Sequence, residues 1–302
     1  MKNRSLIMGS TLFAIIILLG LSAPYLPFVD KNLTEHGLIR NSDGKLLVPP
    51  FPPSMEFPLG SNHKGVDILS IILIGTKETF IVVFATAILR YLLAIPLGIG
   101  AFYFRFVKAL LKGLNQLFSY LPPIFFVGVI IGLPFIIFSH YHSLWMIFVI
   151  AIIEVGRVSD IFLKNMEETN KKPFVESGIV TGCTRFTLFK KYFWPELQPH
   201  VFTNFFNDLG RILFLIAQLG IVAIFISHEF FSTLNGAYVI ANSSNAWPTL
   251  LIDLLNNIWG KTWIPYSAIT IITITLFSLH LISNGLENYF QRKTNKSQGV
   301  GV

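Results

Sequence analysis

The sequence predicts an all-α membrane protein with six transmembrane helices. Of its 302 residues, 53% are hydrophobic and only 13% are charged, where a soluble chain carries roughly a quarter. The mean hydropathy is +0.62. Several apolar stretches without charged residues come near the length that a helix needs to cross a bilayer, and a helix satisfies its own backbone hydrogen bonds there. We therefore expect one transmembrane domain over residues 1–302.

The first expected span covers residues 6–28, which contain no Asp, Glu, Lys or Arg and follow Lys2 and Arg4. An apolar stretch at this position also suggests a secretory signal. The stretch is longer than the roughly 7–15 residues of a signal peptide, and no A-x-A cleavage site follows it. Pro24 and Pro27 fit the end of a spanning helix. We expect the segment to be retained as a membrane anchor.

The other five spans are expected at residues 77–103, 114–138, 144–163, 201–227 and 265–288. Between Lys112 and Glu154, 41 consecutive residues carry no charge, which favours a helical hairpin with a polar tip at residues 139–143. His140 and His142 lie in this tip and offer a metal site as an alternative. Their i, i+2 spacing with no carboxylate nearby in the sequence favours ordinary turn residues at the membrane interface.

The positive charges predict the orientation. With the N-terminus inside, fifteen of the 23 Lys and Arg residues fall in cytoplasmic segments and five in outer ones. Because positively charged loops stay in the cytoplasm, both termini are predicted to be cytoplasmic. The formal net charge of +7 is attributed to this topology. A nucleic-acid partner is not expected, since the sequence has no basic stripe interleaved with stacking aromatic residues.

Two segments outside the spans are longer than a turn. Residues 30–74 are expected to form an extracytoplasmic loop over the bundle, largely non-helical because Pro49-Pro50-Phe51-Pro52-Pro53 is stiff and extended. Residues 165–200 are expected in the cytoplasm, where they combine many charges with helix-like spacing of apolar residues at Phe174, Val175, Ile179 and Val180. A helical hairpin of this kind needs a protein surface to cover it.

The cytoplasmic segment carries a spaced motif of acid, glycine and proline. Glu176 lies near the start of a short helix, Gly182 permits a break, and Pro195 ends the second helix or opens the next span. The segment resembles the coupling loop of ABC-importer permeases, with the pattern E-A-A-x-x-x-G, nine residues, then I-x-L-P. The acid, glycine and proline match; the departures are Ser177 and Gly178 at the two alanines, and Tyr192 and Trp194 at the aliphatic positions.

A second segment resembles the dipeptide, oligopeptide and nickel branch of these permeases. That branch has L-G-T-D-x-x-G-R-D-x-L-S before its second span, and the positions that match here are Leu59, Gly60, Gly65, Asp67, Leu69 and Ser70. Ser61, Asn62 and Val66 depart from the pattern. Trp247 is similarly placed to the Trp of a P-S-W-G element in the outer loop before the last span. The resemblance covers residues 6–290 and implies the second permease subunit of the branch.

The resemblance implies a type I ABC-importer bundle in a bacterial plasma membrane. It also implies four further chains: a second homologous permease, two ATP-binding subunits and an extracytoplasmic substrate-binding protein. ATP and magnesium would be bound by the ATP-binding subunits, so no cofactor is expected on this chain. Rocking of two half-bundles would provide alternating access, driven through the segment from Glu176 to Pro195.

Charges within the expected spans are candidates for function because they are costly in hydrocarbon. Asp208 and Arg211 lie three residues apart in the fifth span and are expected to form a structural pair or a gate. Arg90 has no obvious partner in its own helix; an interhelical pair is favoured over contact with a substrate carboxylate. Glu154, Arg157 and Asp160 lie toward the inner end of the fourth span.

The predicted function is that of the transmembrane subunit of an ATP-driven, binding-protein-dependent importer for peptides or related solutes, and not an enzyme. A nickel or metal-chelate importer of the same family is the first alternative. A polytopic membrane enzyme would need a convergent nucleophile, base or metal set, and the sequence offers none. A stand-alone secondary carrier is disfavoured by the lack of an evident repeat between the halves.

Overall fold

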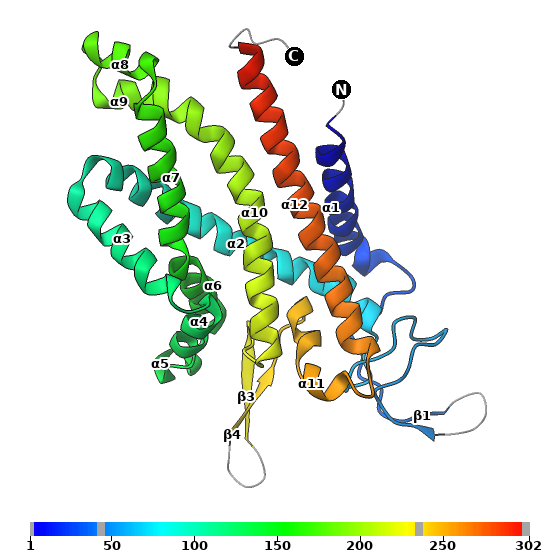
Figure 1. Ribbon diagram of the computed structural model, residues 1–302. Coiled ribbons are helices and arrows are strands. Elements are labelled where there is room, and N and C mark those ends of the chain that lie inside the picture. Colours follow the sequence, from blue (N-terminus) through cyan, green and yellow to red (C-terminus); the bar gives the residue numbers. More distant parts are fainter. Residues whose placement is uncertain (1–2, 41–45, 233–237, 298–302) are drawn as a thin grey trace.

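The computed structural model describes residues 3–40, 46–232 and 238–297. It is built almost entirely from helices (Figure 1). The helices are α1 Arg4–Ser22, α2 Ile68–Tyr103, α3 Arg105–Ser119, α4 Pro123–Ile131, α5 Pro134–Ile137, α6 His142–Ile153, α7 Val155–Asn170, α8 Pro173–Val180, α9 Arg185–Leu188, α10 Trp194–Ile221, α11 Leu254–Asn257 and α12 Trp263–Ser297. Two antiparallel hairpins pair β1 Ile39–Arg40 with β2 Leu46–Leu47, and β3 His228–Ser232 with β4 Tyr238–Asn242.

Three of the described helices, α1, α2 and α12, are long and apolar enough to cross a membrane. A fourth span results if α3 and α4, which meet at a bend of 91°, are counted as one. The chain nevertheless passes repeatedly between two ends of the bundle, with the N- and C-terminal regions at the same end as α8 and α9 (Figure 1). The hairpin strands and α11 lie at the opposite end. A total of six spans remains a prediction.

The observed helix boundaries differ from those of several expected spans. The second helix begins at Ile68 rather than at residue 77, so the outer loop is shorter than the expected 30–74. The expected third span is not one straight helix, because α3 ends before Pro122 and Pro123, and a third proline, Pro134, opens α5. The expected fourth span is interrupted at Glu154, between α6 and α7.

The segment expected as a cytoplasmic loop, residues 165–200, is largely helical. The helix α7 continues to Asn170, and α10 begins at Trp194, ahead of the expected start of the fifth span at residue 201. Between them lie α8, α9 and a π-helical turn over Phe189–Phe193. The two long helices therefore extend without a flexible joint into the segment that carries the acid, glycine and proline motif.

Small residues set the close packing between helices. A methyl group at Gly9 of α1 would lie 2.8 Å from the backbone nitrogen of Ile282 in α12. At Gly98 of α2, a methyl group would lie 2.7 Å from the carbonyl oxygen of Ser159 in α7. Helices in membranes associate through such close backbone approaches, because burial of apolar surface supplies little drive in lipid. The larger core cluster includes residues of α2, α6, α10 and α12 and surrounds Trp247.

Candidate functional site

The tip formed by α8 and α9 begins and ends on capping residues. Pro173 occupies the first turn of α8, where a missing backbone N–H costs nothing, and Glu176 adds a negative charge to that turn. The helix ends at Val180, and Gly182 follows with a φ of +78°, a left-handed conformation that glycine adopts without strain. The Cys183 amide donates to the carbonyl of Gly178 at 3.1 Å and closes the turn. The break expected at Gly182 is present.

The return segment leads directly into the long helix α10. The Thr184 hydroxyl accepts from the Thr187 amide at the start of α9, and a π-helical turn then joins α9 to α10. Pro195 lies in the first turn of α10, so of the two roles expected for it, it opens the next helix. Trp194 is half-buried, with its ring centroid 6.1 Å from that of Phe189.

The tip is anchored to the bundle by its apolar face. Val175 and Met166 are fully buried in one cluster with Phe193 and Leu197. The same cluster contains Tyr91 of α2, so the core reaches from the tip to the middle of the bundle. An ion pair at 2.6 Å, Lys172 to Glu196, ties the start of α8 to the start of α10. The tip is therefore packed against both α7 and α10.

The sizes of the side chains at positions 178 and 192 compensate for each other. Both depart from the family pattern, which has an alanine at the first position and an aliphatic residue at the second. Gly178 is buried, and a methyl group there would lie 3.0 Å from both the Tyr192 ring and the Leu188 side chain. The Tyr192 ring also stacks on Phe174, with a centroid distance of 6.2 Å. The larger residue at 192 occupies the room that the smaller residue at 178 leaves.

We expect Gly178→Ala to destabilise the purified protein by about 1–3 kcal/mol, because the added methyl group overpacks the contact with Tyr192. Tyr192→Ile should restore most of that loss when combined with it. Thermal unfolding in detergent of the two single variants and the double variant measures the coupling. Strictly additive effects would contradict the compensation.

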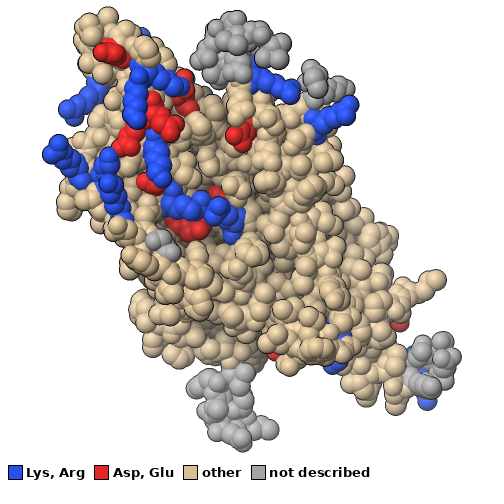
Figure 2. All heavy atoms as spheres, viewed as in Figure 1, with Lys and Arg blue, Asp and Glu red and all other residues tan. Residues whose placement is uncertain are grey.

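The outer surface of the tip combines exposed apolar side chains with positive charge. Val180 is 82% exposed, Phe186 is 74% exposed, and Ile179 is 54% exposed, although each lies in or next to a well-anchored helix. Glu176 and Ser177 are exposed on the same short helix. Lys and Arg side chains gather at this end of the molecule (Figure 2); those exposed in the tip are Lys171, Arg185, Lys190 and Lys191. Exposed apolar surface rimmed by charge is typical of interaction sites.

A second group of functional candidates is a buried ion network in the middle of the bundle. The Arg90 guanidinium, wholly buried, donates to Glu154 at 2.9 Å and to both carboxylate oxygens of Asp208 at 2.9 and 3.0 Å. Arg157 contacts the same two carboxylates, Glu154 at 3.3 Å and Asp208 more closely. The interhelical pair expected for Arg90 is confirmed. The network joins α2, the α6–α7 break and α10.

The pair expected between Asp208 and Arg211 is not the one that the structure forms. Asp208 is 2% exposed and faces Arg90 and Arg157, whereas the Arg211 side chain is exposed. Spacing along one helix indicates which residues share a face but not which partner a neighbouring helix supplies. The sequence signal for the network was the presence of two arginines and two carboxylates in different expected spans.

Arg90 also explains why the helix can break at Glu154. Its guanidinium donates to the carbonyl of Ile150 at 2.7 Å and to that of Ala151 at 3.3 Å. These carbonyls belong to the last turn of α6, where helical partners are missing. A cation at a helix C-terminus is also favoured by the helix dipole. Arg90 therefore caps α6 and holds the chain at the point where it turns into α7.

At the opposite end, the segment from Leu59 to Asp67 builds the start of α2. Gly60 and Gly65 have φ values of +79° and +77°, and a methyl group at Gly65 would lie 2.0 Å from the carbonyl oxygen of His36. The Asp67 carboxylate accepts from the Ser70 amide at 2.8 Å and caps the helix. Leu59 packs against the core. These residues shape and cap a turn.

Trp247 fixes the loop before the last long helix. It is fully buried, its indole N–H donates to the carbonyl of Ile72 at 2.8 Å, and its amide donates to the Thr79 hydroxyl at 3.0 Å. Glu78, which sequence reasoning did not select, accepts from the Ser244 hydroxyl at 2.6 Å and from the Asn245 amide at 2.8 Å. The sequence signal for this contact was weak. It consisted of an acid near the start of a spanning helix and of polar residues in a distant loop.

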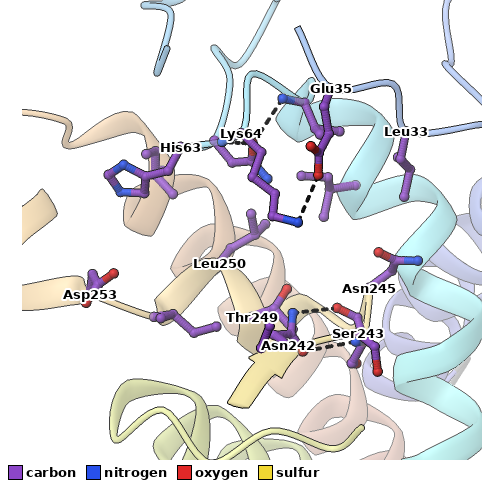
Figure 3. Close-up of a pocket in the computed structure, with 17 residues that line it drawn as sticks. Leu33, Glu35, His63, Lys64, Asn242, Ser243, Asn245, Thr249, Leu250 and Asp253 are labelled. Atoms are coloured by element: carbon purple, nitrogen blue, oxygen red, sulfur yellow. Dashed lines mark hydrogen bonds and ion pairs between the residues drawn. The ribbon is translucent and has the colours of Figure 1, made fainter. Parts of the chain in front are cut away.

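Between these two outer segments lies a cavity of about 440 Å³ (Figure 3). Its buried lining is mostly apolar and includes Val66, Ile71 and Leu250. Polar residues also line it: Glu35 and Lys64 form an exposed ion pair at 2.8 Å, and Asn242, Ser243, Asn245 and Asp253 lie on the same cavity. Because both walls are held by caps and hydrogen bonds, the cavity is preformed.

The candidate residues thus form three groups along the bundle: the α8–α9 tip, the buried ion network and the outer segments. The structure does not bring the tip and the outer segments together, since they lie at opposite ends (Figure 1). Within the described residues, no cluster of three or more His, Cys, Asp or Glu side chains is arranged to hold a metal ion.

Comparison with known proteins gives a family match over residues 91–296, to the model described as binding-protein-dependent transport system inner membrane component. Two curated relatives carry the name oligopeptide transport system permease protein OppC, from Lactococcus lactis subsp. lactis (strain IL1403) and subsp. cremoris (strain SK11). Each is 23% identical over 209 residues. The aligned stretch spans 67% of this chain and 65% of the length of each relative.

Proposed function

The chain belongs to the binding-protein-dependent transport system inner membrane components, and we propose that it is the transmembrane subunit of an ATP-driven importer. The observation that carries the proposal is the α8–α9 tip. It presents exposed apolar and basic side chains outward, while its buried face is continuous with the core around α7 and α10. Such an element transmits a push from a partner protein into the bundle.

The proposed mechanism starts with closure of two partner ATPase subunits on ATP. Their movement displaces the tip, in which Glu176, Ser177, Gly178, Gly182, Trp194 and Pro195 form or support the contact. The Lys172–Glu196 ion pair and the shared core carry the displacement to α7 and α10. The buried ion network ties both helices to α2, so that they move together. Two half-bundles that rock in this way alternate access between the two sides.

The proposed partners are a second, homologous permease chain, two ATP-binding subunits and an extracytoplasmic substrate-binding protein. The preformed outer cavity and the charged residues that line it support docking of the binding protein at the end that carries β3 and β4. Peptides are the favoured substrate class, because both curated relatives are named for oligopeptide transport. Nickel or a metal chelate is the alternative within the family.

Reconstitution tests the proposal. We expect proteoliposomes with this chain, the second permease and the ATPase subunits to take up peptide when ATP and the binding protein are supplied. This chain alone should neither hydrolyse ATP nor transport. Uptake without a second permease would support a homodimer and contradict the heteromer. Uptake by this chain without any ATPase would indicate a secondary carrier.

We propose that the α8–α9 end faces the cytoplasm, and cysteine labelling tests this orientation. In a Cys183→Ser background, Met55→Cys and Val180→Cys place single thiols on exposed positions at opposite ends of the bundle. An impermeant maleimide should label Met55→Cys in intact cells and Val180→Cys only after permeabilisation. The reverse pattern would invert the topology, and labelling of both in intact cells would contradict it.

A further inference from the structure

The β3–β4 hairpin is attached to the neighbouring helices through two histidines. The ring centroids of His142, at the start of α6, and His228, at the start of β3, lie 4.1 Å apart. His142 Nδ1 lies 3.3 Å from the carbonyl oxygen of Ile226, and His228 Nε2 lies 2.8 Å from that of Ile137. Each ring therefore reaches across to the backbone of the other segment, so the two contacts form a crossed brace.

The brace assigns a neutral tautomer to each ring. A carbonyl oxygen only accepts, so His142 must carry its proton on Nδ1 and His228 on Nε2. These two protons satisfy the brace with no charge on either ring. Addition of a second proton to both rings would keep both hydrogen bonds but would place two positive charges next to each other. The brace is consequently stable only while at least one ring remains neutral.

The surroundings offer little compensation for such charges. No Asp, Glu, Lys or Arg occurs between residues 113 and 153, which include α4, α5 and α6. The titratable groups near the pair are His140 and Tyr141 at the α5–α6 corner and Glu229 on β3. Glu229 is exposed, and alternation along the strand directs it to the face opposite His228.

Burial of His142 disfavours its protonation, as does the repulsion between the two charged rings. His142 is 6% exposed and lies in the expected hairpin tip, outside the expected span. Loss of solvation there, and then the neighbouring His228, lowers the pKa of His142 below its ordinary value. A lowered pKa means that the seated hairpin is favoured above the pKa of a free imidazole, near 6.5, and loses this advantage as the pH falls.

Most of β3 is exposed. His228 is half-buried, while Glu229, Phe230, Phe231 and Ser232 are all exposed. Phe230 adds a stacked contact with Phe138, at a centroid distance of 5.3 Å. A two-stranded hairpin is only marginally stable by itself, so the contacts at the brace decide whether it stays seated.

The base of the hairpin is held independently of the brace. Ser227 and Ser243 join its two ends through their hydroxyls at 2.5 Å, and Glu78 holds the following residues on α2. We propose that His142 and His228 form a proton-sensitive latch, which seats the β3–β4 hairpin on the α5–α6 corner when neutral and releases it about its base when both rings are protonated. Asn242, which pairs with His228 in the hairpin, lines the outer cavity, so release changes the wall beside that residue. That this wall faces the outside rests on the proposed function; the latch itself does not.

Distance measurement on the purified chain in detergent tests the latch. In a Cys183→Ser background, nitroxide labels on Leu144→Cys of α6 and Phe231→Cys of β3 occupy exposed positions on the two sides of the brace. Double electron–electron resonance at about pH 7.5 should give one narrow distance distribution. At about pH 5, below the ordinary pKa of histidine, a longer and broader component should replace most of it.

Matched variants separate the latch from general effects of acid. His142→Asn and His228→Gln each keep an N–H near the position of the original donor but cannot take up a proton, so the double variant should give the narrow distribution at both pH values. His140→Gln, at an exposed neighbouring position, should keep the full response. If the double variant fails to seat, His228→Gln alone must show a smaller acid response than the parent.

Two results would overturn the proposal. The first is an unchanged distribution between the two pH values in the parent. The second is an acid response that persists at full size in the double variant or in His228→Gln. The measurement needs no partner subunit and no transport. Its outcome therefore does not depend on whether uptake can be reconstituted.

Discussion

Replacement of Asp208 by asparagine is expected to destabilise the protein by about 3–5 kcal/mol, because it removes a charge from a buried ion network. Arg90 is fully buried, and Asp208 supplies two of its hydrogen bonds. Without the carboxylate, the positive charge of Arg90 would be balanced only by Glu154, which Arg157 also contacts. Thermal unfolding of the purified protein in detergent measures the loss.

A matched control is available on α7. Asp160 forms an ion pair with Lys164 at 2.7 Å, but the Lys164 side chain is 68% exposed. Asp160→Asn should therefore cost about 0–1 kcal/mol. The double variant Arg90→Met/Asp208→Leu should lose less stability than the sum of its single variants, since it leaves neither charge unpaired. An effect of Asp208→Asn no larger than that of Asp160→Asn would contradict the structural importance of the network.

Replacement of Gly182 by tryptophan should abolish ATP-driven uptake while the chain still inserts into the membrane. Nothing lies within 4 Å of a methyl group built at Gly182, so the side chain leaves the backbone into open space. The positive φ adds only about 1–2 kcal/mol of strain. The indole would instead project from the tip surface and interfere with the partner. We expect uptake to fall at least about tenfold, which corresponds to about 1.4 kcal/mol of docking free energy.

Gly182→Asn is the control, because asparagine tolerates the left-handed conformation and adds little volume. It should retain most of the uptake. Measurement of ATP hydrolysis with the reconstituted ATPase subunits distinguishes uncoupling, in which hydrolysis persists, from loss of assembly. Normal binding-protein-dependent uptake by Gly182→Trp would refute the role of the tip as the coupling element.

The α8–α9 tip shows how far local sequence allows a prediction. The first turn of α8 with Glu176 and the break at Gly182 follow from the intrinsic preferences of these residues, and the structure has them. For Pro195 the sequence left open whether it ends one helix or opens the next, and the structure places it in the first turn of α10. The spacing of the motif did not predict why position 178 is a glycine, because the Tyr192 ring that fills the space comes from the returning segment. In the same way, the prolines that interrupt the expected third span were visible in the sequence, but the bend of 91° depends on how α3 and α4 pack.

The sequence by itself determined that this chain is a helical membrane permease, since long apolar stretches and the family motifs are properties of contiguous residues. It also indicated that Arg90 needs a partner from another helix, because a lone charge is costly in hydrocarbon. Only the tertiary structure decided that Asp208 pairs with Arg90 and Arg157 rather than with Arg211, and that His142 meets His228. Such contacts join residues far apart in the chain, and their geometry depends on helix rotation and on breaks such as that at Glu154, which hydrophobic patterns leave open.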